Sequence, residues 1–208
     1  MKAAEQHHET KVAGRLATVS DVVALTDAPG IHRLIEVYSE LRGGNASTLP
    51  RRKELKPECL APFLPDTASI GFNDAGEPYF RLVGERIRMN FQKSPVGQPY
   101  RTFVAPERAD SAVASFVACR THRCGMFVSL RKIDRRGRIF DVEVLCLPFA
   151  GDGDRETVDS IFLVDFERNA KDWSDASVDH SIAQVVNRRY FVDLGFGVPT
   201  DHMDIVAA

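Results

Sequence analysis

The chain has 208 residues, 44% of them hydrophobic and 27% charged, and a formal net charge of −2. These proportions are typical of a globular domain that can bury a core. A charge so close to zero gives no electrostatic reason to expect binding to nucleic acid or to an anionic membrane. The polar N-terminus lacks the apolar segment of a secretory signal, and no apolar run approaches the length that spans a bilayer. We therefore expect a cytoplasmic protein without a membrane span.

The first structural signals follow a polar segment, residues 1–26, which we expect to be a mobile tail. Asp27 is a candidate N-cap, Pro29 suits the first turn of a helix, and Gly43-Gly44 ends it. Between them, apolar side chains recur at helical spacing and predict one apolar face: Ile31, Leu34, Ile35, Tyr38 and Leu41.

Residues 45–66 hold several prolines and predict a loop or short helical turns. The next segments, 68–72 and 79–83, have the composition of strands, and the turn residues 73–76 between them predict a hairpin. Residues 85–92 then suit a short helix.

A longer helix is predicted over 106–121, with three strand-like runs after it, at 126–133, 139–147 and 159–166. The short connections between these runs make neighbouring strands antiparallel. We expect the domain to occupy residues 27–167. Residues 168–208 then form a C-terminal helical extension, predicted from the spacing of four apolar residues: Val178, Ile182, Val185 and Val186.

The element order predicts an α+β fold, with a five-stranded antiparallel sheet, a helical insertion after its second strand, and flanking N- and C-terminal helices. In the last strand, Phe162 and Val164 alternate with Ile161 and Leu163, so both faces of the sheet are apolar. The outer face must therefore be covered by a terminal helix or by a second subunit.

Several short motifs occur in a fixed order: Tyr38-Ser39-Glu40-Leu41-Arg42-Gly43-Gly44, Leu49-Pro50-Arg51-Arg52, Phe80-Arg81-Leu82-Val83-Gly84, Leu147-Pro148-Phe149 and the strand 161–166. Together they resemble a bacterial family of stand-alone PAS-like (Per-Arnt-Sim) proteins. Ser39 departs from the family pattern, which often has Trp there. The resemblance implies the PAS sheet order 2-1-5-4-3 and a regulatory role in bacterial signalling, and it implies no particular ligand.

Two cofactors of PAS sensors are disfavoured. A flavin sensor of the light-oxygen-voltage kind needs a reactive Cys in an Asn-Cys-Arg-Phe motif, and the nearest string, Met89-Asn90-Phe91-Gln92, has no thiol. A haem sensor needs an axial His in the helical insertion, and residues 84–105 contain none. A small ligand of another kind is compatible with the sequence.

Such a ligand would lie between the inner sheet face and the helical insertion. The candidate lining residues are Phe91, Phe103, Phe116, Val128 and Val144. The alternative is that the same side chains simply form the core.

Metal binding and catalysis have weaker support. Cys119, His122 and Cys124 are possible metal ligands, but no second pair completes a zinc pattern, and buried cysteines more often act as small apolar residues. Asp141 and Glu143 share one strand face and could be an acid and a base, although such pairs more often form a solvated face. No nucleophile or phosphate-binding motif occurs. We expect no metal and no enzyme activity.

The sequence thus favours a regulatory PAS-type sensor or interaction module that acts through a signalling partner. The alternatives are a small enzyme with a pocket between sheet and helices, and a structural adaptor without ligand. We further expect a homodimer, formed through the apolar face of the 27–43 helix, the outer sheet face, or both. In the competing arrangement the C-terminal helix covers the outer face and the chain is a monomer.

Overall fold

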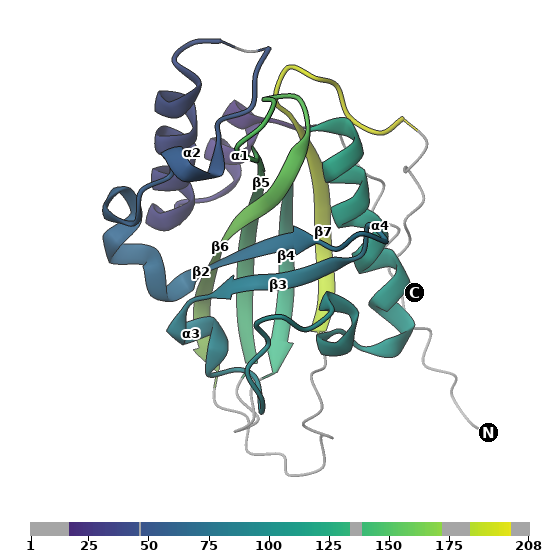
Figure 1. The fold of residues 1–208 in the computed structure, drawn as a ribbon. Helices are drawn as coiled ribbons and strands as arrows, with labels where there is room; N and C mark the ends of the chain where they lie inside the picture. The colour runs from purple at the N-terminus through teal and green to yellow at the C-terminus, as the bar shows by residue number, and fades with distance from the viewer. Residues whose placement is uncertain (1–16, 46, 134–138, 172–183, 201–208) are drawn as a thin grey trace, which may run out of the picture.

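The computed structural model describes residues 17–45, 47–133, 139–171 and 184–200, and its centre is one seven-stranded sheet (Figure 1). All neighbouring strands are antiparallel except β1 and β7. From one edge to the other the order is β1 (Ala17–Thr18), β7 (Gln184–Asp193), β4 (Gly125–Ile133), β5 (Ile139–Ala150), β6 (Val158–Lys171), β2 (Thr67–Phe72) and β3 (Pro78–Val83).

The five strands from β2 to β6 are those predicted from the sequence. Their order, β3-β2-β6-β5-β4, is the predicted PAS order 2-1-5-4-3. Strands β5 and β6 are longer than predicted, because their pairing continues from Ala150 opposite Val158 to Ile139 opposite Lys171.

Helices lie on both sides of the sheet. Figure 1 shows α1 and α2 on one side and α4 on the other. The outer layer contains α1 (Val19–Leu25), α2 (Pro29–Arg42) and the 3-10 segments η1 (Arg52–Glu54) and η2 (Pro57–Asp66). The inner layer is the insertion between β3 and β4, with α3 (Glu85–Arg88), η3 (Tyr100–Phe103) and α4 (Pro106–His122). None of the helices in the described ranges is long and apolar enough to cross a membrane.

Each sheet face has its own core, as the two-sided apolar strand predicted. On β6, Ile161 and Leu163 belong to the inner core with Phe116 of α4. Val164 belongs to the outer core with Leu34 of α2. The outer face is therefore covered by the N-terminal helices of the same chain.

The ends of α2 follow the sequence closely, with one change. Pro29 is the first helical residue, and Gly43 ends the helix in the left-handed conformation, with φ of 58°. The N-cap is Ala28, not Asp27, and it makes no side-chain capping bond.

The predicted mobile tail, residues 1–26, is wrong for its last part. Val19–Leu25 forms α1, which begins with a capping box: the backbone N–H of Asp21 donates to Thr18 Oγ1 (3.2 Å), and that of Thr18 donates to Asp21 Oδ2 (2.7 Å). Residues 1–16 lie outside the described residues.

The predicted C-terminal helix is also wrong where the chain is described. Residues 168–171 continue β6, and Val185 and Val186 lie in β7, which pairs with β4. The physical reason is that β4 would otherwise present a row of unpaired backbone groups at the sheet edge, and β-branched residues suit a strand beside it. Val178 and Ile182 fall outside the described residues.

Candidate functional site

A cavity of about 60 Å³ lies between α4 and the inner face of the sheet. Its wall is mostly apolar, and strands β4, β5, β6 and β7 all contribute to it. The apolar lining consists of Val104, Ala112, Phe116, Met126, Val128, Leu130, Val144, Cys146, Leu163 and Val186, and the polar lining of Tyr100, Arg108, Ser115 and Arg189. This combination of apolar walls with a few polar groups is typical of small-molecule sites.

The structure places three of the five candidate pocket residues in this wall, namely Phe116, Val128 and Val144. The other two, Phe91 and Phe103, pack edge-on against each other with ring centroids 5.0 Å apart. Each also lies 5.7 Å from the ring of Phe80. They form an aromatic cluster beside the cavity and do not line it.

The polar lining comes from three elements. Arg189 lies on β7 opposite Val128 of β4. Its Nη1 donates to Ser111 Oγ on α4 (3.1 Å), while its Nε is buried without a hydrogen-bond partner among the described residues. Tyr100 comes from η3, and Arg108 from the first turn of α4.

Burial changes the acid–base properties of these groups. It lowers the pKa of Arg189, and the nearby cation of Arg108 lowers it further. Burial likewise lowers the pKa of Arg108. It raises the pKa of Tyr100 to about 12, so this hydroxyl keeps its proton at neutral pH.

The buried thiols are also held protonated. Burial raises the pKa of Cys146, which lines the cavity, to about 12. It raises that of Cys119 as well, helped by a hydrogen bond with Cys124. Within the described residues, no group of three or more His, Cys, Asp or Glu side chains is placed to hold a metal ion. Neutral thiols are poor nucleophiles and poor metal ligands.

The predicted dimer face has a different role. Ile31 and Leu34 are fully buried, and Ile35 and Tyr38 nearly so, in the outer core of their own chain. Leu41 packs against the same core. This face of α2 is therefore not available to a second subunit, and the predicted interface through it is corrected.

A second polar cluster surrounds the Leu49-Pro50-Arg51-Arg52 motif. The backbone N–H groups of Ala150 and Leu49 donate to Pro50 O (2.9 Å) and Arg155 O (3.2 Å), so the motif lies along the β5–β6 turn. Arg52 Nε donates to Asp159 (3.2 Å).

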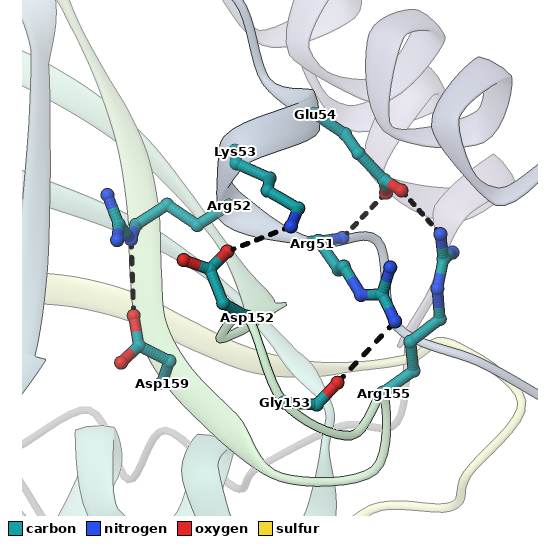
Figure 2. Close-up of polar contacts among 8 residues, drawn as sticks. All are labelled: Arg51, Arg52, Lys53, Glu54, Asp152, Gly153, Arg155 and Asp159. Atoms are coloured by element: carbon teal, nitrogen blue, oxygen red, sulfur yellow. Dashed lines mark hydrogen bonds and ion pairs between the residues drawn. The ribbon is translucent and has the colours of Figure 1, made fainter.

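Figure 2 shows how the charges of this cluster pair with one another. Lys53 lies 3.6 Å from Asp152, and Arg155 pairs with Glu54. The Glu54 carboxylate also accepts from the backbone N–H of Arg51 (2.8 Å). Because Asp152 of the turn pairs with Lys53, and Asp159 near the start of β6 pairs with Arg52, this cluster holds the turn and the start of β6 to the segment after α2.

Sequence reasoning missed Tyr100, Arg108 and Arg189. Arg189 could be found only after β7 was recognised, and the signal for that strand was the aromatic and β-branched run Tyr190-Phe191-Val192 before Gly195.

A model of the PAS domain family matches residues 26–162, which run from just before α2 into β6. A solved structure of a variant of RsLOV aligns with a TM-score of 0.37 and 18% identity, covering 58% of this chain and 68% of that one. Curated proteins gave no match. The family match covers strands β2 to β5, the start of β6 and the inserted helices, and it ends before the cavity residues Leu163, Val186 and Arg189. Because it covers more than half of the chain, the chain belongs to the PAS domain family.

Proposed function

We propose that the protein is a regulatory PAS module that senses a small molecule in the cavity under α4 and acts through a partner protein. PAS domains are generally sensory or regulatory. The observation that carries the proposal is the cavity itself, where the inserted helix and four strands meet around Arg189 and Tyr100. A ligand there would touch α4 and the sheet together, so its binding would favour one arrangement of the two.

The cavity favours a small ligand over a flavin. Sites for drug-sized ligands have volumes of about 300–1,000 Å³, whereas this cavity measures about 60 Å³. That space holds a few non-hydrogen atoms. We therefore propose a ligand smaller than a flavin.

Binding is better supported than catalysis. The cavity thiol, Cys146, stays protonated at neutral pH because burial raises its pKa to about 12. Ser115, the serine of the wall, donates its hydroxyl proton to the backbone oxygen of Ser111 (2.7 Å). That acceptor is not a general base, so the bond does not activate Ser115 as a nucleophile. Self-association stays part of the proposal, through a surface other than the apolar face of α2.

Native mass spectrometry of the purified chain tests the proposal. We expect an added mass on the wild-type protein, lost in Ala112→Leu, whose larger side chain fills the cavity. Ala114→Leu is the matched control, since Ala114 is on the same helix and outside the cavity wall. If the wild type has no added mass, and its melting temperature does not respond to a low-molecular-mass metabolite extract, the structural adaptor is the better function.

A further inference from the structure

The polar lining of the cavity includes an arginine with unused hydrogen-bonding capacity. Arg189 uses Nη1 to hold Ser111 on α4. Its Nε is buried and has no hydrogen-bond partner within the described part of the chain. A buried donor left without a partner destabilises the folded state. An acceptor in the cavity would remove that destabilisation.

A second arginine lines the same cavity. Arg108 faces it from the first turn of α4. The field of Arg108 acts on Arg189 strongly enough to lower its pKa, beyond the effect of burial. Two cations that share a partly buried space repel each other, and an anion between them would reverse that effect.

One buried carboxylate lies on the same sheet face. Asp165 is on β6, opposite Val144 of β5, and its Oδ2 accepts a hydrogen bond from Lys132, while its Oδ1 has no partner among the described residues. Asp165 does not line the cavity, but beyond the effect of burial its charge helps to raise the pKa of Tyr100 and Cys146, which do, so the two arginines must outweigh it if an anion is to bind.

We propose that the cavity binds a small organic carboxylate, with its carboxylate group at Arg189 and Arg108 and its short apolar body against α4 and the sheet. The inference rests on the proposed function, because it names the class of the ligand in the same cavity. The guanidinium group matches a carboxylate through parallel N–H donors. Tyr100, whose hydroxyl is protonated at neutral pH, is a further donor in the wall.

The walls decide between carboxylate and phosphate. Apart from the arginines, Tyr100 and Ser115, the lining is apolar, as at Val128, Leu130 and Val144, and so offers few donors to a third oxygen. Transfer of a doubly charged anion into such surroundings costs more than transfer of a single carboxylate. A carboxylate with a short hydrocarbon tail combines one charge with an apolar body, as the cavity lining combines two arginines with mostly apolar side chains.

Isothermal titration calorimetry on the full chain tests the ligand class. The probes are butyrate, its neutral isostere butyramide, and inorganic phosphate, at constant ionic strength, after the protein has been unfolded and refolded to remove retained molecules. We expect butyrate to bind at least about tenfold more tightly than butyramide or phosphate, since hydrogen bonds to charged groups contribute about 1.5–3 kcal/mol each.

A matched pair of variants locates the site. Arg189→Gln should weaken butyrate binding by about tenfold or more. Arg188→Gln, the exposed neighbour on the same strand, should stay within about twofold of wild type because Arg188 does not line the cavity. Near-UV circular dichroism checks that each variant is folded. If Arg189→Gln is not, Arg108→Gln takes its place with the same expected loss.

The outcomes separate the ligand class from the proposed function. Three results would overturn the proposal of a carboxylate ligand. They are equal binding of butyrate and butyramide, tighter binding of phosphate than of butyrate, and full butyrate affinity in the arginine variant. A retained molecule in native mass spectra with no binding of any probe also overturns it, while the sensor function stands. No retained molecule and no binding overturns both.

Discussion

The hydroxyl of Tyr38 on α2 donates a hydrogen bond of 2.9 Å to the carbonyl oxygen of Pro148 on β5, across 110 residues of sequence. The Tyr38 ring also meets Phe149 edge-on, with centroids 5.3 Å apart. Arg51, just after α2, forms a parallel bridge with Ala150 at the end of the same strand. Thus the motif that contains Tyr38 contacts the Leu147-Pro148-Phe149 motif, and the motif that contains Arg51 pairs with the next residue of the same strand, Ala150.

Removing the Tyr38 hydroxyl should weaken this contact without removing the ring. We expect Tyr38→Phe to lower the free energy of unfolding by about 1 kcal/mol, because a buried carbonyl loses its donor. Chemical denaturation measures the change. Ser39→Ala is the control, because it also removes a hydroxyl. The Ser39 hydroxyl donates to the backbone oxygen of Ile35 from an exposed position, so its loss should change the unfolding free energy by no more than about 0.5 kcal/mol. An equal effect of both variants would contradict the role of the Pro148 contact.

Gly84 is required by close packing, and not by its backbone angles. Its φ of −66° suits any residue, but an added Cβ would lie 2.2 Å from the carbonyl oxygen of Leu64 and 2.6 Å from that of Pro65. Gly84→Ala must therefore displace the end of η2, and we expect a loss of about 3 kcal/mol in unfolding free energy. Gly153→Ala, where a Cβ meets nothing within 4 Å, should change stability little. If Gly84→Ala and Gly153→Ala had the same melting temperature, Gly84 would not lie as close to the end of η2 as described.

Ile35 distinguishes a core helix from a dimer interface. Its side chain is 9% exposed and belongs to the outer core, so Ile35→Glu buries an unpaired carboxylate. We expect a loss of about 4 kcal/mol or more and an unfolded or aggregating chain. Circular dichroism and light scattering measure the outcome. Glu36→Ala, at the exposed neighbouring position, should leave both signals unchanged. A folded Ile35→Glu monomer at half the wild-type mass would instead identify α2 as a subunit interface.

The sequence predicted most elements between residues 29 and 166 because their signals are local. Gly43 ends α2, the turn at 73–76 joins β2 to β3, and periodicity identified α4. The apolar residues on both sides of β6 correctly predicted that other elements cover both faces of the sheet. These patterns depend only on neighbours along the chain.

The errors lie where a distant partner decides the structure. Val185 and Val186 have a spacing compatible with a helix, but the open edge of β4 makes them a strand. The same strand brings Arg189 into the cavity, so a misassigned element also concealed a site residue. Phe91 and Phe103 were expected to line the pocket, but they are partly buried and pack on Phe80 beside it, an arrangement that the sequence pattern could not reveal.

Glu167 gives the fold a pH dependence that one substitution can isolate. It is partly buried on β6 and accepts a hydrogen bond of 3.4 Å from Asn90 Nδ2. Burial raises its pKa above the ordinary 4.5, and the opposing attraction of Lys132 is smaller. The folded state therefore holds this proton more tightly than the unfolded chain does.

The sign of the effect follows from that difference. The stabilisation from the bound proton is complete below pH 4.5 and is lost as the pH rises through the higher folded-state value. At neutral pH the ionised carboxylate destabilises the fold, so Glu167→Gln, which keeps the acceptor for Asn90, should raise the melting temperature by about 2 °C at pH 7. Near pH 4, which is below the ordinary pKa of 4.5, Glu167 of the wild type is itself protonated. The difference in melting temperature between the wild type and the variant should then vanish. Differential scanning calorimetry at both pH values, with exposed Glu58→Gln as control, checks this. A gain that is equal at the two pH values, or larger in acid, would mean that ionisation of Glu167 is not its cause.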